Sequence, residues 1–293
     1  MSRKTFQKAL KTKDFAVTAQ INLEDAPNVE ALHAAGDVLR PAVDAVQLYD
    51  STRMHMSGVA AAALLLQQEM DPIVHMNCRD RNRIALLKDL IGAAALGVDN
   101  VLLTRGKKVP DVEKLGVRSV FDLPALELMS YVQSMKETDS EPELAELQIG
   151  ASAAVFSPAE GWAPKTLLRK FDAGASFVQL HPCFDLQVGR NYMAHIIAAK
   201  LTHRASFIMA LAPLPSADAA RWVRDNVRGA LVPEAIIERL ESASDPEQEG
   251  IDICAEQLKE LATIPGVAGA NLLSVGRLEM IPAAVEASGV RDN

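Results

Sequence analysis

Residues 71–106 read DPIVHMNCRDRNRIALLKDLIGAAALGVDNVLLTRG and contain one complete strand–helix–strand unit. Residues 72–77 form a short apolar run with β-branched side chains, which predicts a buried strand. Residues 82–96 repeat apolar side chains at helical spacing, and Gly97 marks the end of that helix. Residues 100–104 (NVLLT) predict a second buried strand. Two strands joined by a helix lie parallel, so this stretch indicates an α/β sheet.

The same alternation of strand, loop and helix recurs along the whole chain. Further strands are predicted at residues 15–21, 45–49, 147–154, 176–180, 206–211 and 266–273. Helices are predicted at residues 28–38, 57–69, 122–135, 164–173, 191–201, 217–225, 233–242, 247–261 and from 278 onward. Repeats of about 35 residues favour closure into a (β/α)8 TIM barrel, with residues 1–293 as a single domain. An open doubly wound sheet is the alternative, which the lack of G-x-G-x-x-G after the first strand weakens.

Composition excludes several classes of protein. The net charge is −8, and no basic tract suggests nucleic acid or an anionic membrane surface. No apolar run approaches the roughly 20 residues of a membrane span, and the N-terminus lacks a signal-peptide core. Cys78, Cys183 and Cys254 are too few for a disulfide framework. His75 with Cys78, and His181 with Cys183, lack a zinc-site spacing, so no metal is expected. We therefore expect a cytoplasmic protein with no nucleic-acid or membrane partner.

In a parallel barrel the reactive groups gather where the strands end. The polar residues at the predicted strand ends are Gln20, Asn22, Gln47, Tyr49, Asp50, His75, Asn77, Arg105, Lys107, Ser152, Gln179, His181, Asn271 and Ser274. Asp50, Asp80 and Asp185 are the acids near these ends, and Asp185 is expected to cap the next helix. A proton donor needs a carboxyl group whose pKa burial has raised, and a sequence does not reveal burial.

Residues 75–86 (HMNCRDRNRIAL) and 89–97 (DLIGAAALG) closely resemble the methylenetetrahydrofolate reductase family. The resemblance resumes at residues 120–123, 168–175, 229–233 and 249–251. It implies a barrel that holds FAD, which takes hydride from NADH or NADPH and passes it to 5,10-methylenetetrahydrofolate, yielding 5-methyltetrahydrofolate. A reduced folate is thus the expected substrate. Family members are often oligomers, so the resemblance also implies a homo-oligomer.

The resemblance implies a set of cofactor-binding residues at the strand ends. Positions that contact the flavin ring or its phosphates match Tyr49, His75, Arg105, Gly106 and Lys170. Cations and backbone amides beside a diphosphate are chemically reasonable. Two of these residues also have a structural interpretation. His75 fits a hydrogen-bonded core histidine, and Lys170 is favourable at the end of a helix without any ligand.

The chain departs from the family at the positions that handle protons and folate. Gln20 stands where the family has the glutamate that protonates the folate, and an amide cannot donate that proton. Lys107 stands where an aspartate is usual, and His181 replaces a folate-binding glutamine, with Gln179 two residues before it. The catalytic candidates are therefore Gln20, Asp50 and Lys107, with the proton coming from Asp50 or from a water held by Gln20. The substrate-binding candidates are Gln20, Gln179 and His181.

These departures leave three functions open. The first is a flavin-dependent reductase of this family with an altered proton donor. The second is a divergent folate-binding enzyme of one-carbon metabolism that works without flavin or in the oxidative direction. The third is a non-catalytic partner subunit, in which the loss of carboxylates reflects the loss of chemistry.

Overall fold

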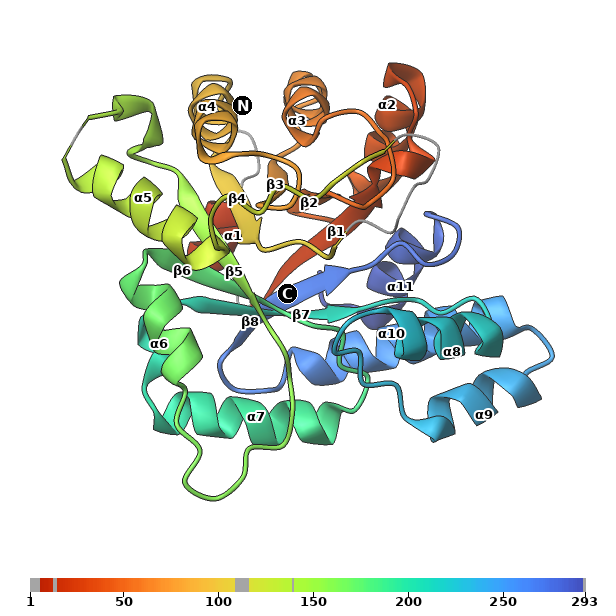
Figure 1. Ribbon diagram of the computed structural model, residues 1–293. Coiled ribbons are helices and arrows are strands. Elements are labelled where there is room, and N and C mark those ends of the chain that lie inside the picture. The colour runs from red at the N-terminus through yellow and green to blue at the C-terminus, as the bar shows by residue number, and fades with distance from the viewer. Residues whose placement is uncertain (1–5, 13–14, 109–115, 139, 292–293) are drawn as a thin grey trace.

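The computed structural model describes residues 6–12, 15–108, 116–138 and 140–291. Eight strands pair in parallel in the order of the sequence, and β8 pairs back to β1, so the barrel is closed (Figure 1). The strands are β1 (Ala16–Asn22), β2 (Ala45–Tyr49), β3 (Pro72–Asn77), β4 (Asn100–Thr104), β5 (Gln148–Ala153), β6 (Ala175–Leu180), β7 (Ser206–Leu211) and β8 (Val267–Leu272). The expected (β/α)8 barrel is confirmed, and the open sheet is excluded.

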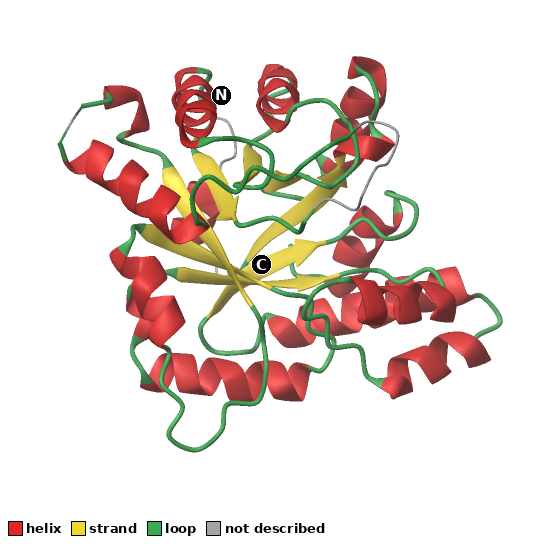
Figure 2. Ribbon diagram, viewed as in Figure 1, coloured by secondary structure: helices red, strands yellow, loops and turns green. Residues whose placement is uncertain are grey.

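Helices surround the barrel on the outside, as Figure 2 shows in red around the yellow strands, except α1, which lies at the amino end of the barrel. Those in the described ranges are α1 (Phe6–Thr12), α2 (Val29–Leu39), α3 (Gly58–Gln67), α4 (Arg83–Ala95), α5 (Ala125–Glu137), α6 (Lys165–Asp172), α7 (Leu186–Ala198), α8 (Ala217–Asn226), α9 (Glu234–Ser242), α10 (Pro246–Leu261) and α11 (Met280–Ser288). None of the helices in these ranges is both long and apolar enough to cross a bilayer.

The element bounds follow the sequence patterns closely, with two differences. Helix α7 begins at Leu186, five residues before the predicted start, because the Asp185 carboxylate accepts a hydrogen bond from the Val188 amide at 3.1 Å. Asp185 is thus the helix cap that the sequence indicates. Helix α1 has no predicted counterpart. Residues 109–115, within the long loop expected after the fourth strand, lie outside the described residues.

The barrel interior is layered from apolar to polar. Near the amino ends of the strands an apolar layer is formed by Phe6, Ala45, Ile73, Leu102, Phe177 and Ile208. Phe6 enters this layer from α1, with its ring edge-on to Phe177 at 5.1 Å. The Phe6 amide donates to the Asp71 carboxylate at 2.6 Å, which holds α1 against the barrel. Above this layer, toward the carboxyl ends, the interior side chains are polar.

Candidate active site at the carboxyl ends of the strands

Gln47 lies at the centre of a hydrogen-bonded network inside the barrel. Its Nε2 donates to Thr18 Oγ1 at 3.2 Å and to Gln179 Oε1 at 2.8 Å. Its Oε1 lies 2.8 Å from Nε2 of His75. Thr18 donates in turn to Asn271 Oδ1 at 2.9 Å. The network ties together β1, β2, β3, β6 and β8, and a buried polar network of this kind is stable only when its members are paired.

His75 is neutral in this network. Because Gln47 Oε1 can only accept, the ring carries its proton on Nε2, and Nδ1 is left as an acceptor. Burial lowers the pKa of His75 to about 4, so the imidazole is uncharged at pH 7. Tyr49 lies edge-on to the ring at 5.8 Å, and burial raises the pKa of its hydroxyl. The pair is therefore uncharged and can line a ligand ring.

Two amides meet where β1 ends. Gln20 Nε2 donates to Asn22 Oδ1 at 2.8 Å, and Asn22 Nδ2 donates to Asp25 Oδ2 at 3.2 Å and to the Ser274 carbonyl at 3.1 Å. Neither amide can release a proton as an acid. Both can position a water molecule or a polar ligand group.

Asp50, at the end of β2, is surrounded by basic groups. Its Oδ2 lies 3.2 Å from Arg81 Nη1, and its Oδ1 lies 3.7 Å from Arg79 Nη2 and 3.8 Å from His55 Nε2. The Asp50 side chain is only 10% exposed. Arg79 also donates to the Ser51 carbonyl at 2.6 Å, which fixes its guanidinium. Both Asp50 oxygens thus already face protein groups, which favours an anchoring role.

The two basic side chains of the segment after β4, Arg105 and Lys107, have partners outside the network. The Arg105 guanidinium lies over the Phe121 ring, 4.4 Å from its centroid, in a cation–π contact. Lys107 Nζ donates to the carbonyl of Asn226 at 3.1 Å, at the end of α8. Lys107 therefore connects the loop after β4 to the end of α8.

Gly106 turns the chain between these two residues with a φ of +80°. A Cβ atom there would lie 2.9 Å from Arg79 Cβ and 3.0 Å from Asn77 Oδ1. Only glycine fits this close approach to the end of β3. Packing alone therefore explains the glycine, whether or not a ligand binds.

A basic cluster lies at the ends of β5 and β6. Lys170 Nζ donates to the Ser152 carbonyl at 2.5 Å, and burial together with the nearby Arg228 lowers the pKa of Lys170. Burial, together with the nearby charges of Arg228 and Lys170, lowers the pKa of His181 to about 4. His181 Nδ1 is buried, with no hydrogen-bond partner among the described residues. Gly229 lies against this atom, since a Cβ there would be 2.4 Å from it.

The structure brings five of the candidate residues into two groups. Tyr49, His75 and Gln179 lie in or against the network on β2, β3 and β6. Lys170 and His181, with Arg228, form the basic cluster. The remaining candidates contact other residues and join neither group; they are Gln20, Asp50, Arg105, Gly106 and Lys107. Gln179 and His181 lie two residues apart, so the two groups are adjacent. Sequence reasoning missed Arg228, because no pattern relates residue 228 to positions 170 and 181. It also missed the partners of Asp50, although Arg79 and Arg81 lie within residues 71–106, where the sequence pattern is clearest. The described residues hold no group of acids, histidines and cysteines that could bind a metal ion.

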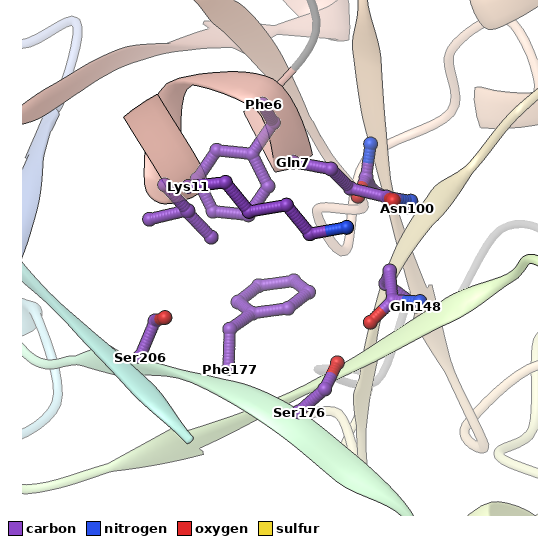
Figure 3. A pocket seen from close by; sticks show the side chains of 9 residues that line it. Phe6, Gln7, Lys11, Asn100, Gln148, Ser176, Phe177 and Ser206 are labelled. Atoms are coloured by element: carbon purple, nitrogen blue, oxygen red, sulfur yellow. The ribbon is translucent and has the colours of Figure 1, made fainter. Parts of the chain in front are cut away.

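A cavity lies at the opposite end of the barrel, where the strands begin (Figure 3). It has a volume of about 160 Å³ and lies between α1 and the first residues of several strands, including Asn100, Ser176 and Ser206. Reactive groups of TIM barrels collect at the carboxyl ends, whereas this end serves stability. The candidate site is therefore the polar mouth, not this cavity.

The closed parallel barrel, with polar side chains at the carboxyl ends of its strands, defines a (β/α)8 protein. A model of the family described as methylenetetrahydrofolate reductase matches residues 31–289, most of the chain. The chain therefore belongs to the methylenetetrahydrofolate reductase family. No curated protein matches it significantly.

A search of solved structures matches two forms of tryptophan synthase from M. tuberculosis. The open form with BRD0059 bound has 14% sequence identity and a TM-score of 0.48, covering 98% of this chain and 96% of that one. The aminoacrylate- and BRD0059-bound form has 13% identity and a TM-score of 0.44, covering 84% and 94%. At these scores neither structure bears on function.

Proposed function

We propose that the protein is a methylenetetrahydrofolate reductase-like oxidoreductase that interconverts 5,10-methylenetetrahydrofolate and 5-methyltetrahydrofolate with FAD and NAD(P)H. Family membership over residues 31–289 is the observation that carries this proposal. The bound flavin would supply hydride transfer between the nicotinamide and the folate. The residues at the barrel mouth would bind and orient the flavin and the folate, and would hold the proton that the folate receives.

The basic cluster supports a site for the flavin phosphates. Lys170 and Arg228 form no salt bridge with any acid in the described ranges, and His181 Nδ1 lacks a partner. An oxyanion would neutralise this local positive charge, so the residues present fit the diphosphate of FAD. The flavin ring would lie toward the neutral pair Tyr49 and His75, with Arg105 and Gly106 beside it.

The folate would lie over the ends of β1 and β6, against Gln20, Gln179 and His181. Gln179 is only 7% exposed, and its Oε1 accepts a hydrogen bond from Gln47. Gln179 would therefore contribute to folate binding by holding the hydrogen-bonded network in place. A water held by Gln20 supplies the proton, because Asp50 already faces Arg79 and Arg81. Lys107, the remaining catalytic candidate, is exposed and would act from the edge of the barrel mouth.

The experiment is an anaerobic assay of the purified protein loaded with FAD. Oxidation of NADH or NADPH is followed with and without 5,10-methylenetetrahydrofolate, and 5-methyltetrahydrofolate is measured by mass spectrometry. The proposal expects folate-dependent oxidation with an equal amount of product. An FAD-loaded protein without turnover in either direction contradicts it.

A divergent folate-binding protein is the second candidate, because the end of β1 carries amides in place of a carboxyl group. A colourless protein that binds reduced folates and takes up no added FAD would favour a flavin-free folate enzyme. A protein that binds neither ligand would favour a non-catalytic partner subunit. Self-association as a homo-oligomer is proposed for all three candidates and is measured by light scattering.

A further inference from the structure

The segment that contains Arg228 is fixed beside the end of β6. The Leu231 amide donates to the Pro182 carbonyl at 2.9 Å, and the Phe184 amide donates to the Leu231 carbonyl at 2.8 Å. Cys183 and Leu231 are paired as an isolated parallel bridge. The turn after α8 therefore runs alongside the turn after β6, although some fifty residues separate them, and Arg228 is held near His181.

Arg228 differs from the other arginines of its region in having no acidic partner. Arg224, one helical turn earlier, lies 2.9 Å from Glu234 and 3.2 Å from Asp225. Arg221 is paired with Asp218 and with Glu241. In the ranges that the structure describes, neither Arg228 nor Lys170 forms a salt bridge. Two like charges that lie close together without a counter-ion are unfavourable, and a bound anion would relieve them.

Packing holds both basic residues beside the ends of β5 and β6. Lys170 is tied to the Ser152 carbonyl, so its ammonium cannot move freely away from the strand ends. Gly229 has a φ of +72° and lies directly against His181 Nδ1, a position that only glycine can occupy. This contact sets the path of the chain next to Arg228. The exposed guanidinium and the half-buried ammonium are thus presented at the strand ends together.

We propose that Arg228 and Lys170 form an oxyanion-binding subsite, with Arg228 as the residue that determines how tightly the mouth holds an anionic ligand group. The inference rests on the proposed function and names the residue of its basic cluster that sets the affinity for the anion. The shared chemistry is a phosphate or a carboxylate, which a guanidinium can bind through two parallel hydrogen bonds. The anion is either the diphosphate of FAD or the glutamate carboxylates of the folate.

The test compares Arg228→Gln with wild type, and Arg224→Gln serves as the matched control on the same helix end. Dissociation constants are measured by fluorescence titration at low and high salt for two ligand pairs. The pairs are FAD with riboflavin, and tetrahydrofolate with tetrahydropteroate, which lacks the glutamate. We expect Arg228→Gln to bind either FAD or tetrahydrofolate roughly 10- to 100-fold more weakly, with a shallower salt dependence. Binding of the counterpart that lacks the diphosphate or the glutamate, and all binding by Arg224→Gln, should be unchanged.

The pair that responds identifies the source of the anion. Equal losses for both members of each pair, or wild-type affinities for all four ligands, would overturn the subsite. If wild type binds none of the four, the proposed function fails, and thermal shift with inorganic pyrophosphate decides the subsite separately. Stabilisation by pyrophosphate that Arg228→Gln abolishes supports the subsite, and its absence in wild type overturns it.

Discussion

Gln20 Nε2 donates to Asn22 Oδ1 at 2.8 Å, so two amides occupy the point where β1 opens into the barrel mouth. A carboxylic acid at position 20 could donate to the same Asn22 oxygen. That hydrogen bond would favour the neutral acid and raise its pKa. Asn22 is therefore a suitable hydrogen-bond partner for a carboxylic acid at position 20, which this chain lacks.

We predict that Gln20→Glu raises reductase turnover, because it restores an acid at the end of β1. General acid catalysis is worth about 10²- to 10⁴-fold, so a gain of tenfold or more is expected. The rate should fall as pH rises and the new carboxyl group ionises. Gln20→Met, which has nearly the same size and no polar group, is the control and should lower turnover. Unchanged turnover in Gln20→Glu would refute the assignment of position 20.

Neutral His75 makes stability depend on pH. Its pKa is about 4 in the folded protein against about 6.5 unfolded, so the unfolded chain binds the proton more tightly. The contribution is fully present above pH 6.5 and is lost as pH falls toward 4, by up to about 3 kcal/mol. In His75→Gln the loss of stability between pH 7 and pH 4.5 should be smaller, as measured by urea unfolding. His181 contributes in the same direction and remains in the variant. An identical loss in both proteins would contradict the prediction.

Gly250 lies in α10 where it touches the backbone of the loop after β7. A Cβ atom there would lie 1.9 Å from the Leu214 carbonyl oxygen. Gly250→Ala should therefore destabilise the protein by about 2 kcal/mol or more, through a forced shift of backbone. Gly92→Ala in α4 is the matched control, because its Cβ would meet nothing within 4 Å. It should stabilise by about 0.5–1 kcal/mol through helix propensity. Urea unfolding of the two variants tests the contrast, and equal effects would oppose it.

Phe6 closes the amino end of the barrel, and its side chain is fully buried against Phe177. Phe6→Ala should cost about 3–5 kcal/mol, the usual loss for an aromatic side chain in a core. Phe6→Leu, which keeps most of the apolar volume, should cost less. A midpoint of urea unfolding that is the same for wild type and Phe6→Ala would mean that α1 does not close the barrel in solution.

The sequence predicts the order and class of the elements because apolar periodicity and turn residues are local signals. Four strands, including Pro72–Asn77 and Ser206–Leu211, have the predicted bounds. The layering inside the barrel was not predictable in the same way. Strands buried on both faces carry no clear alternation, so the pattern does not reveal that Gln47 faces inward to His75. Contacts between distant loops, such as Arg228 beside His181, depend on the tertiary fold and leave no local signal.

The most direct test of flavin binding at the barrel mouth is the visible absorption spectrum of the purified protein, followed by titration with FAD. If the mouth holds a flavin, the protein is yellow as isolated, or binds one FAD per chain when it is added. A folded barrel, verified by circular dichroism, that shows no flavin absorbance and no response to added FAD would contradict the account.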